Sequence, residues 1–354
     1  MTGPAALSLA YRLSAGAGHV RKLLPRRWTE GAPTGGQLAA LGDDPLFRDT
    51  AWSKRILASQ FRCEILRRFA ETASLRDLDA FCERKVVYET GFDFARLRQL
   101  GRPLILATPH YGAYVMACMV ALGDFGDRPV NIFYEDPARN PANAQFEAIF
   151  RRRPNANVLL NGRRGVIAAI KALRNNECLT MMPDVYLDVD DTIAVPFFGR
   201  LMRAMTGTAF FALHADALVA PVYVLPDDRF GIRIRISEPL DPRACRAGDE
   251  AQKLFRITRD LFADMERTFR RAPEHWVYWR SFGSLSSESR RAAPDAGLRG
   301  ELQQRLRVVP FLARRVPALV SSMDDLADRV RQPARGRPGG AIPASGLCSP
   351  ATTG

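Results

Sequence analysis

The pattern of apolar and polar positions changes near Gly91. From about residue 37 to residue 89, apolar side chains recur at helical spacing among Arg and Glu, which predicts amphipathic helices. The recurring positions are Ile56, Phe61, Ile65 and Phe69. After Gly91, short apolar runs alternate with helical patterns. This alternation predicts an α/β fold in which helices cover a central mixed sheet, preceded by a helical N-terminal segment.

Short apolar runs bounded by Gly, Pro or Asp predict buried strands. These runs lie at 104–107, 130–134, 156–160, 178–182 and 218–224. At 232–236, Ile alternates with Arg, which predicts a strand with one solvent-exposed face. Helical patterns at 166–174 and 206–215 separate some of these strands, as expected for an α/β sheet.

Changes in composition mark two candidate domain boundaries. A break rich in Gly, Pro and Thr ends a basic N-terminal segment, 1–36. Ser and Arg are frequent after the predicted core, an amphipathic stretch follows at 302–330, and the C-terminal end is rich in Gly, Pro, Ser and Ala. We therefore predict one domain over 37–284 and an extension over 285–354 that is partly helical and then disordered.

The N-terminal segment has no apolar run close to the ~20 residues that span a bilayer. Its basic residues follow the weak apolar stretch instead of preceding it, which is unlike a signal peptide. Apolar residues at 5–11, followed by Arg21, Lys22, Arg26 and Arg27, suit a helix that lies on an anionic membrane surface. The alternative is a frayed or loosely docked helix.

The chain is strongly basic. Lys+Arg 51 against Asp+Glu 38 gives a net charge of +13, which favours nucleic acid, an anionic membrane face or an acidic carrier protein as partner. The basic residues are dispersed and form no nucleic-acid-binding signature, so we expect no nucleic-acid partner. The six cysteines form no C-x-x-C pair and only four histidines accompany them. We expect reduced thiols in a cytosolic protein, and no metal.

The most informative stretch is 104–116, in which a predicted buried strand leads through Thr108-Pro109-His110-Tyr111-Gly112 into an apolar helix. This order places an imidazole at the carboxyl edge of a sheet, where open α/β folds bind ligands. An imidazole titrates near neutrality and can take a proton from an attacking hydroxyl. Taken alone, a histidine at a strand end is more often structural than catalytic.

The order of several short blocks resembles that of the bacterial lipid A late acyltransferases, the lauroyl and myristoyl group of the lysophospholipid acyltransferase superfamily. The resemblance covers roughly residues 86–282. The similar blocks are Val87–Gly91, Arg102–Gly112, Tyr134 with Asn140-Pro141, Arg163-Arg164 with Ile170–Arg174, Met182–Asp184, Val195–Arg200 with Thr206-Gly207, Ala220–Val222, and Pro273–Trp276 with Trp279.

This resemblance implies an acyltransferase. In that family a His–acid dyad removes the proton of an acceptor hydroxyl, which attacks an acyl thioester of acyl carrier protein or coenzyme A. The thioester is a co-substrate, and no further cofactor is implied. His110 aligns with the base. Tyr111 and Gly112 beside it are expected to bind substrate, and Arg164 and Arg200 are expected to contact anionic groups.

The chain departs from the family pattern where the dyad acid is expected, because that position is Val115. Three interpretations follow. Another carboxylate replaces the acid, with Asp184 or Asp188 as candidates after a strand that neighbours the first. Alternatively the acceptor is an amine, which attacks before it loses its proton. The third interpretation is a non-catalytic protein that binds acyl chains or their carrier.

The sequence therefore predicts an acyltransferase that transfers a chain from a carrier-protein or coenzyme A thioester to a hydroxyl or amine. The family's usual membrane-spanning N-terminal helix is missing from the pattern. We expect a cytoplasmic protein that binds peripherally to the inner face of the cell membrane through its N-terminal segment or the 302–330 stretch.

Overall fold

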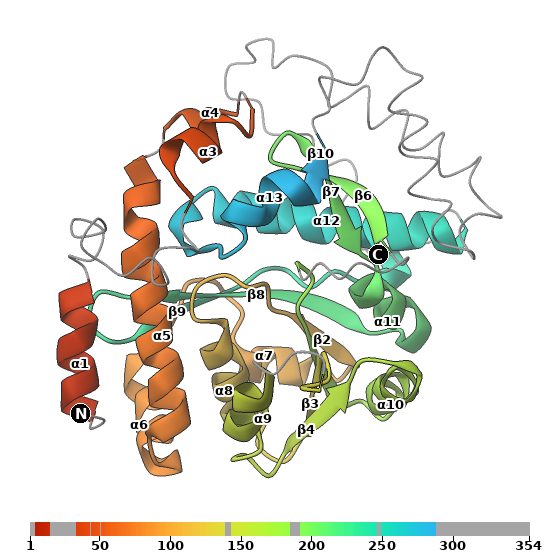
Figure 1. Ribbon diagram of the computed structural model, residues 1–354. Coiled ribbons are helices and arrows are strands. Elements are labelled where there is room, and N and C mark those ends of the chain that lie inside the picture. The colour runs from red at the N-terminus through yellow and green to blue at the C-terminus, as the bar shows by residue number, and fades with distance from the viewer. Residues whose placement is uncertain are drawn as a thin grey trace, which may run out of the picture.

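Short apolar strands build the centre of the fold. The computed structural model describes residues 4–14, 33–42, 44–49, 51–138, 143–184, 192–245 and 249–287. Its main sheet has the strand order β1-β9-β8-β2-β5-β3-β4 (Figure 1). These strands are β1 (Val86–Tyr88), β2 (Leu104–Ala107), β3 (Val130–Tyr134), β4 (Ala156–Leu160), β5 (Cys178–Met181), β8 (Leu218–Pro226) and β9 (Ile232–Ile236). Neighbouring strands are parallel except β8 and β9, so the sheet is mixed, as predicted.

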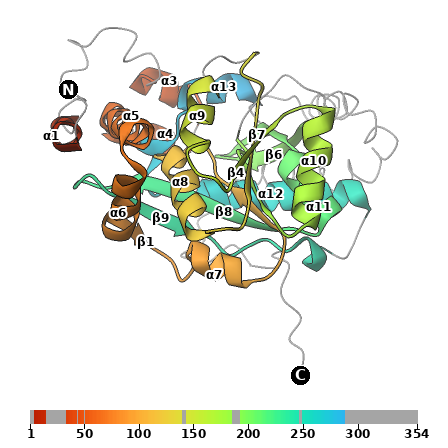
Figure 2. The ribbon, with the colours of Figure 1, turned by 90° about the horizontal axis from the view of Figure 1, so that it is seen from below.

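Helices cover both faces of this sheet because successive strand residues point to opposite sides. In β2, Leu104 and Leu106 join one apolar core, and Ile105 and Ala107 join the other. Helix α8 lies on the first side and α12 on the second, as Figures 1 and 2 show. The helices are α1 (Pro4–Leu13), α3 (Gly35–Ala39), α4 (Pro45–Arg48), α5 (Ile56–Thr72), α6 (Leu75–Lys85), α7 (Phe94–Gln99), α8 (Tyr114–Asp124), α9 (Asn143–Phe150), α10 (Arg163–Arg174), α11 (Gly207–Ala215), α12 (Glu250–Phe269) and α13 (Trp279–Leu285).

A second, three-stranded sheet extends the core on the α12 side. It consists of β6 (Thr192–Phe197), β7 (Arg200–Met205) and β10 (Ser286–Ser287). The turn between β6 and β7 is Phe198-Gly199, and both residues have positive φ (50° and 70°), the backbone that tight hairpins favour. The sequence pattern did not predict this hairpin. Strand β10 pairs with β7 through Ser286 and Ser287, close to the boundary predicted near residue 284.

The N-terminal helix α1 packs against α5 (Figure 1). Tyr11 is fully buried at this contact, donates a hydrogen bond from its hydroxyl to the carbonyl of Asp227 (2.6 Å), and meets the ring of Phe230 edge-on. A docked helix was one of the two predictions for this segment. None of the helices in the described ranges combines the length and apolar composition that crossing a bilayer requires.

The predicted strands at 104–107, 130–134, 156–160 and 232–236 are confirmed with the same bounds, and those at 178–182 and 218–224 are confirmed to within two residues. The helical patterns at 56–69, 166–174 and 206–215 correspond to α5, α10 and α11. The 302–330 stretch and the disorder predicted beyond it lie outside the described residues, which end at 287.

Candidate active site

The histidine turn is held in place by backbone hydrogen bonds on both sides. The N–H of Gly112 donates to the carbonyl of His275 (2.9 Å), and the N–H of Ala113 donates to the carbonyl of Val224 (2.8 Å). Gly112 has φ +64°, and a Cβ there would meet the Val224 oxygen at 2.0 Å. Only glycine fits this position, because the conformation and the close approach both exclude a side chain. The turn therefore fixes His110 at the carboxyl edge of β2.

Strand register explains why Asp184 lies beside His110. In the parallel pair β2–β5, Ala107 is opposite Met181, and His110 and Asp184 each lie three residues beyond that pair. The two side chains therefore leave the sheet at the same edge and at the same height. The prediction that the strand before Asp184 neighbours the histidine strand is confirmed.

Asp184 is a buried carboxylate with three donors around it. Its Oδ1 lies 3.0 Å from His110 Nδ1, and the His110 backbone N–H lies 3.0 and 2.9 Å from its two oxygens. The indole Nε1–H of Trp276 donates to Oδ2 (3.0 Å). The carboxylate side chain is 0% exposed, whereas that of His110 is 15% exposed. A carboxylate bound this way holds the proton on Nδ1 and leaves the Nε2 lone pair available as a base.

Two tyrosine rings limit the movement of the imidazole. The ring centroids of Tyr114 and Tyr278 lie 4.9 and 5.1 Å from that of His110. Burial raises the pKa of both phenols, so both remain neutral. The imidazole is therefore positioned by aromatic contacts as well as by Asp184, and part of it stays accessible.

His110 opens into a mostly apolar pocket between α8, α9 and the ends of β3 and β5, which we call the His110 pocket. Its enclosed space is about 60 Å³, and about 510 Å³ is reached only when the open space around its mouth is included. Apolar lining comes from Val115, Ile132, Phe133, Phe146 and Met181. Hydrocarbon is favoured in such surroundings because burial removes its surface from water. The pocket therefore suits an alkyl or acyl chain whose reactive end lies near the imidazole.

The other predicted substrate-binding residues lie elsewhere. Tyr111 is 1% exposed, donates to the carbonyl of Ala272 (3.0 Å) and stacks on Phe269, so its side chain supports the core. Arg164 is exposed on the first turn of α10 and does not line the His110 pocket.

Arg200 is buried away from the pocket, on the hairpin side of the fold. It donates to the Ser286 hydroxyl (2.6 Å) and to the carbonyl of Leu41 (2.7 Å). These contacts tie β7 to β10 and to the N-terminal region, which accounts for a guanidinium at this position without an anionic ligand. The prediction of an anion contact gains no support from this placement.

The position at which the family has its acid faces the apolar site. Val115 is 5% exposed and lines the His110 pocket, and Asp188 lies outside the described residues. The contribution of Trp276 was missed, although Trp276 belongs to the closing block of the resemblance. Trp276 and Asp184 are far apart in sequence, so no local pattern indicates their hydrogen bond. The only signal for Trp276 was that it belongs to the closing block.

His275 packs edge-on against the ring of Tyr111 and also makes a polar contact. Its Nδ1 lies 2.6 Å from the Ser59 hydroxyl, and burial lowers its pKa to about 4. In the unfolded chain this imidazole takes up a proton near pH 6.5, whereas in the folded chain it does so only near pH 4. The contribution of the neutral ring to the free energy of unfolding is therefore complete above pH 6.5. It is lost as the pH falls toward 4, by about 3 kcal/mol in total.

We therefore expect the stability difference between the wild type and His275→Gln to shrink as the pH falls from 7 to 4.5. Urea unfolding at a series of pH values measures this difference. If the free energies of unfolding of the two proteins change in parallel with pH, the lowered pKa of His275 is contradicted.

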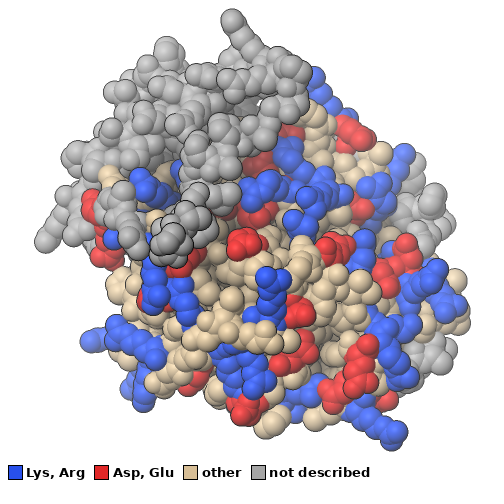
Figure 3. All heavy atoms as spheres, turned by 180° about the vertical axis from the view of Figure 1, so that it is seen from behind, with Lys and Arg blue, Asp and Glu red and all other residues tan. Residues whose placement is uncertain are grey.

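Charges on the surface are mixed. On the face shown in Figure 3, Lys and Arg alternate with Asp and Glu and gather in no single basic patch. Many of the arginines in the described residues form ion pairs, such as Arg102 with Asp241 (2.6 Å) and Arg270 with Asp44 (2.6 Å). Pairing of this kind leaves the net charge unchanged, but it disperses the positive charge instead of gathering it at one place.

Comparison with known proteins agrees with the fold. The family model described as bacterial lipid A biosynthesis acyltransferase matches residues 83–281, which include His110, Asp184 and Trp276. A search of the curated proteins found no match to this chain. The matched residues cover more than half of the sequence and the whole of the main sheet. The chain therefore belongs to the bacterial lipid A biosynthesis acyltransferase family.

Proposed function

We propose that the protein transfers an acyl chain from a thioester of acyl carrier protein or coenzyme A to a hydroxyl or amine, with His110 as the general base. The observation that carries the proposal is the buried Asp184 carboxylate, 3.0 Å from Nδ1 of His110, whose ring lines an apolar pocket. It supplies from β5 the orienting acid that the sequence lacks at Val115. The requirement for an amine acceptor therefore disappears, and a hydroxyl acceptor becomes feasible.

The proposed reaction has two steps. His110 Nε2 takes the proton of the acceptor X–H while X attacks the thioester carbonyl carbon, giving a tetrahedral oxyanion. The C–S bond then breaks, the carbonyl re-forms, and the imidazolium returns its proton to the departing thiolate. Asp184 stabilises the imidazolium between the two steps, since an opposite charge in contact favours the protonated ring.

The start of α8 supports the oxyanion in this proposal. This helix has no side-chain cap, and among the described residues the N–H groups of Tyr114 and Val115 donate to no backbone carbonyl outside the helix. Backbone donors at a helix N-terminus stabilise a developing negative charge. The acyl chain would lie along Ile132, Phe133 and Phe146 with its carbonyl toward the turn.

Attachment to the inner face of the membrane is part of the proposal. Leu9 and Leu13 are one helical turn apart on α1 and are 56% and 70% exposed, on a helix whose Tyr11 faces the domain. Exposed leucines beside basic residues can insert into the interface of an anionic bilayer. Transfer to a membrane-held acceptor would follow from this attachment.

The function is tested by incubating the full chain with lauroyl-acyl carrier protein and lauroyl-coenzyme A and a panel of hydroxyl and amine acceptors. We expect thioester consumption that depends on an acceptor and gives an equal amount of acylated product, read by mass spectrometry. The alternative, a non-catalytic acyl- or carrier-binding protein, rests on Val115 and predicts binding of the thioester without turnover.

A further inference from the structure

A second pocket lies on the other side of Tyr114 from the His110 pocket, and we call it the α5 pocket. It is formed by α5, the start of α8 and the segment around His275, and its volume is about 590 Å³ including its open mouth. Tyr114 and Val115 line both pockets. A molecule in the α5 pocket therefore lies next to the helix start that carries the reactive turn.

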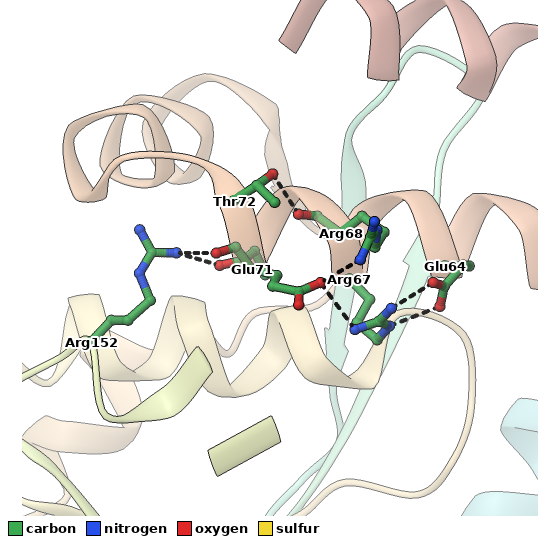
Figure 4. A network of polar contacts seen from close by, with 7 residues as sticks. Glu64, Arg67, Arg68, Glu71, Thr72 and Arg152 are labelled. Atoms are coloured by element: carbon green, nitrogen blue, oxygen red, sulfur yellow. Dashed lines mark hydrogen bonds and ion pairs between the residues drawn. The ribbon is translucent and has the colours of Figure 1, made fainter. Parts of the chain in front are cut away.

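One cation lines the α5 pocket among the described residues, and it is already neutralised. Arg67 donates to both oxygens of Glu64 (2.8 and 2.6 Å) and also contacts Glu71 at 3.4 Å (Figure 4). Its side chain is 14% exposed. Glu71 accepts in addition from Arg68 at 3.1 Å. The guanidinium would have to leave two carboxylates before it could bind an anionic ligand.

The arginines whose fields reach His275 are paired in the same way. Arg55 contacts Glu274 at 2.7 Å, Arg62 contacts Asp228 at 2.7 Å, and Arg233 contacts Glu89 at 3.2 Å. Each pair is built from residues far apart in sequence. These three arginines are therefore compensated by carboxylates, and none of them lines the α5 pocket.

The remaining polar groups of the lining are neutral. His275 is uncharged above about pH 4 and contacts the Ser59 hydroxyl, Gln60 adds an amide, and burial raises the pKa of the Cys63 thiol to about 12. Hydroxyl, amide and imidazole groups can donate or accept hydrogen bonds with an uncharged polar molecule. None of these side chains carries a positive charge that would offset that of a phosphate.

We propose that the α5 pocket binds the head group of the acyl acceptor, and that this head group is polar but carries no phosphate. The inference rests on the proposed function, since it takes the acceptor to react at His110. A phosphate would lie beside the carboxylates of Glu64 and Glu71, whose side chains are 54% and 34% exposed, and like charges in contact repel. To bind the phosphate, Arg67 would have to leave both carboxylates. An uncharged polyol or amide meets no such obstacle.

The test compares two probes that differ by one phosphate. Glycerol monolaurate and lauroyl lysophosphatidic acid are presented to the full chain in identical neutral-detergent micelles, and binding is measured by calorimetry. We expect the uncharged probe to bind at least about tenfold more tightly, a difference of 1.4 kcal/mol. The double variant Glu64→Gln/Glu71→Gln, which releases Arg67, should reduce or reverse this preference.

The location of the binding site is tested by a substitution that fills the α5 pocket. Gln60→Trp, a half-buried position in the lining, should weaken binding of glycerol monolaurate at least about tenfold. Lys54→Trp is the matched control, because Lys54 is exposed just before α5 and outside the pocket. Thermal unfolding confirms that each variant is folded.

Three results would overturn the inference: equal or tighter binding of the phosphorylated probe by the wild type, no effect of Gln60→Trp, or no binding of either probe. Thioester consumption is measured on the same preparation, so that failure of the acceptor pocket can be distinguished from failure of the proposed acyl transfer. Consumption without probe binding rejects the acceptor pocket alone. Probe binding with the expected preference but without consumption rejects the reaction and leaves the binding site.

Discussion

Replacing His110 with alanine is expected to reduce acyl transfer by about 10⁴-fold, to the level that binding and backbone donors alone support. The imidazole is the one described base in the His110 pocket with an orienting carboxylate, and its ring is in part accessible. Without it the acceptor proton has no nearby base at neutral pH. The rate of acylated product formation from lauroyl-acyl carrier protein measures the effect, with thioester binding measured separately.

The matched control is His214→Ala, since His214 lies on α11 with its side chain 35% exposed and does not line the His110 pocket. This variant should retain wild-type transfer. Equal activity of His110→Ala and the wild type would remove His110 from the reaction. Full thioester binding with no turnover even in the wild type would favour the non-catalytic alternative.

Asp184→Asn is expected to lower the rate of acyl transfer by about two to four orders of magnitude. In protease triads, loss of the carboxylate that fixes the histidine tautomer has an effect of about this size. The amide oxygen can take the position of Oδ2 and accept from Trp276 Nε1–H and from the His110 backbone N–H. The amide nitrogen then faces His110 Nδ1 and donates to it. The ring proton must then move to Nε2. Nε2 therefore already carries a proton and cannot take one from the attacking hydroxyl or amine.

Because the donors around the carboxylate stay satisfied, Asp184→Asn should remain folded, and circular dichroism and thermal unfolding check this. Asp264→Asn is the matched control, a buried carboxylate on α12 that accepts from Tyr223 and not from His110. The double variant His110→Ala/Asp184→Asn should be no slower than His110→Ala, since residues that act as one unit are not additive. Additive losses would show that Asp184 acts independently of the histidine.

Much of the site could be predicted from local sequence because it depends on short patterns. The apolar run at 104–107, followed by Pro109, His110 and Gly112, identified a strand, an edge and a turn, and the structure has all three. The acid was narrowed to Asp184 or Asp188 by the expectation that two strands are neighbours. Arginines were the weakest predictions, because an Arg side chain is long and its partner is set by tertiary packing, as Arg200 shows.

The sequence by itself determined six strands of the main sheet, some of the helices between them and the glycine turn, because hydrophobic period and backbone conformation are local properties. It also determined that Val115 cannot serve as an acid. It missed β1 and the β6–β7 hairpin. Only the tertiary structure decided which carboxylate reaches the imidazole, since the parallel register of β2 and β5 places residues 74 positions apart side by side. The same holds for ion pairs such as Arg55 with Glu274 and Arg62 with Asp228, because their partners lie far apart in sequence and meet only in the folded chain.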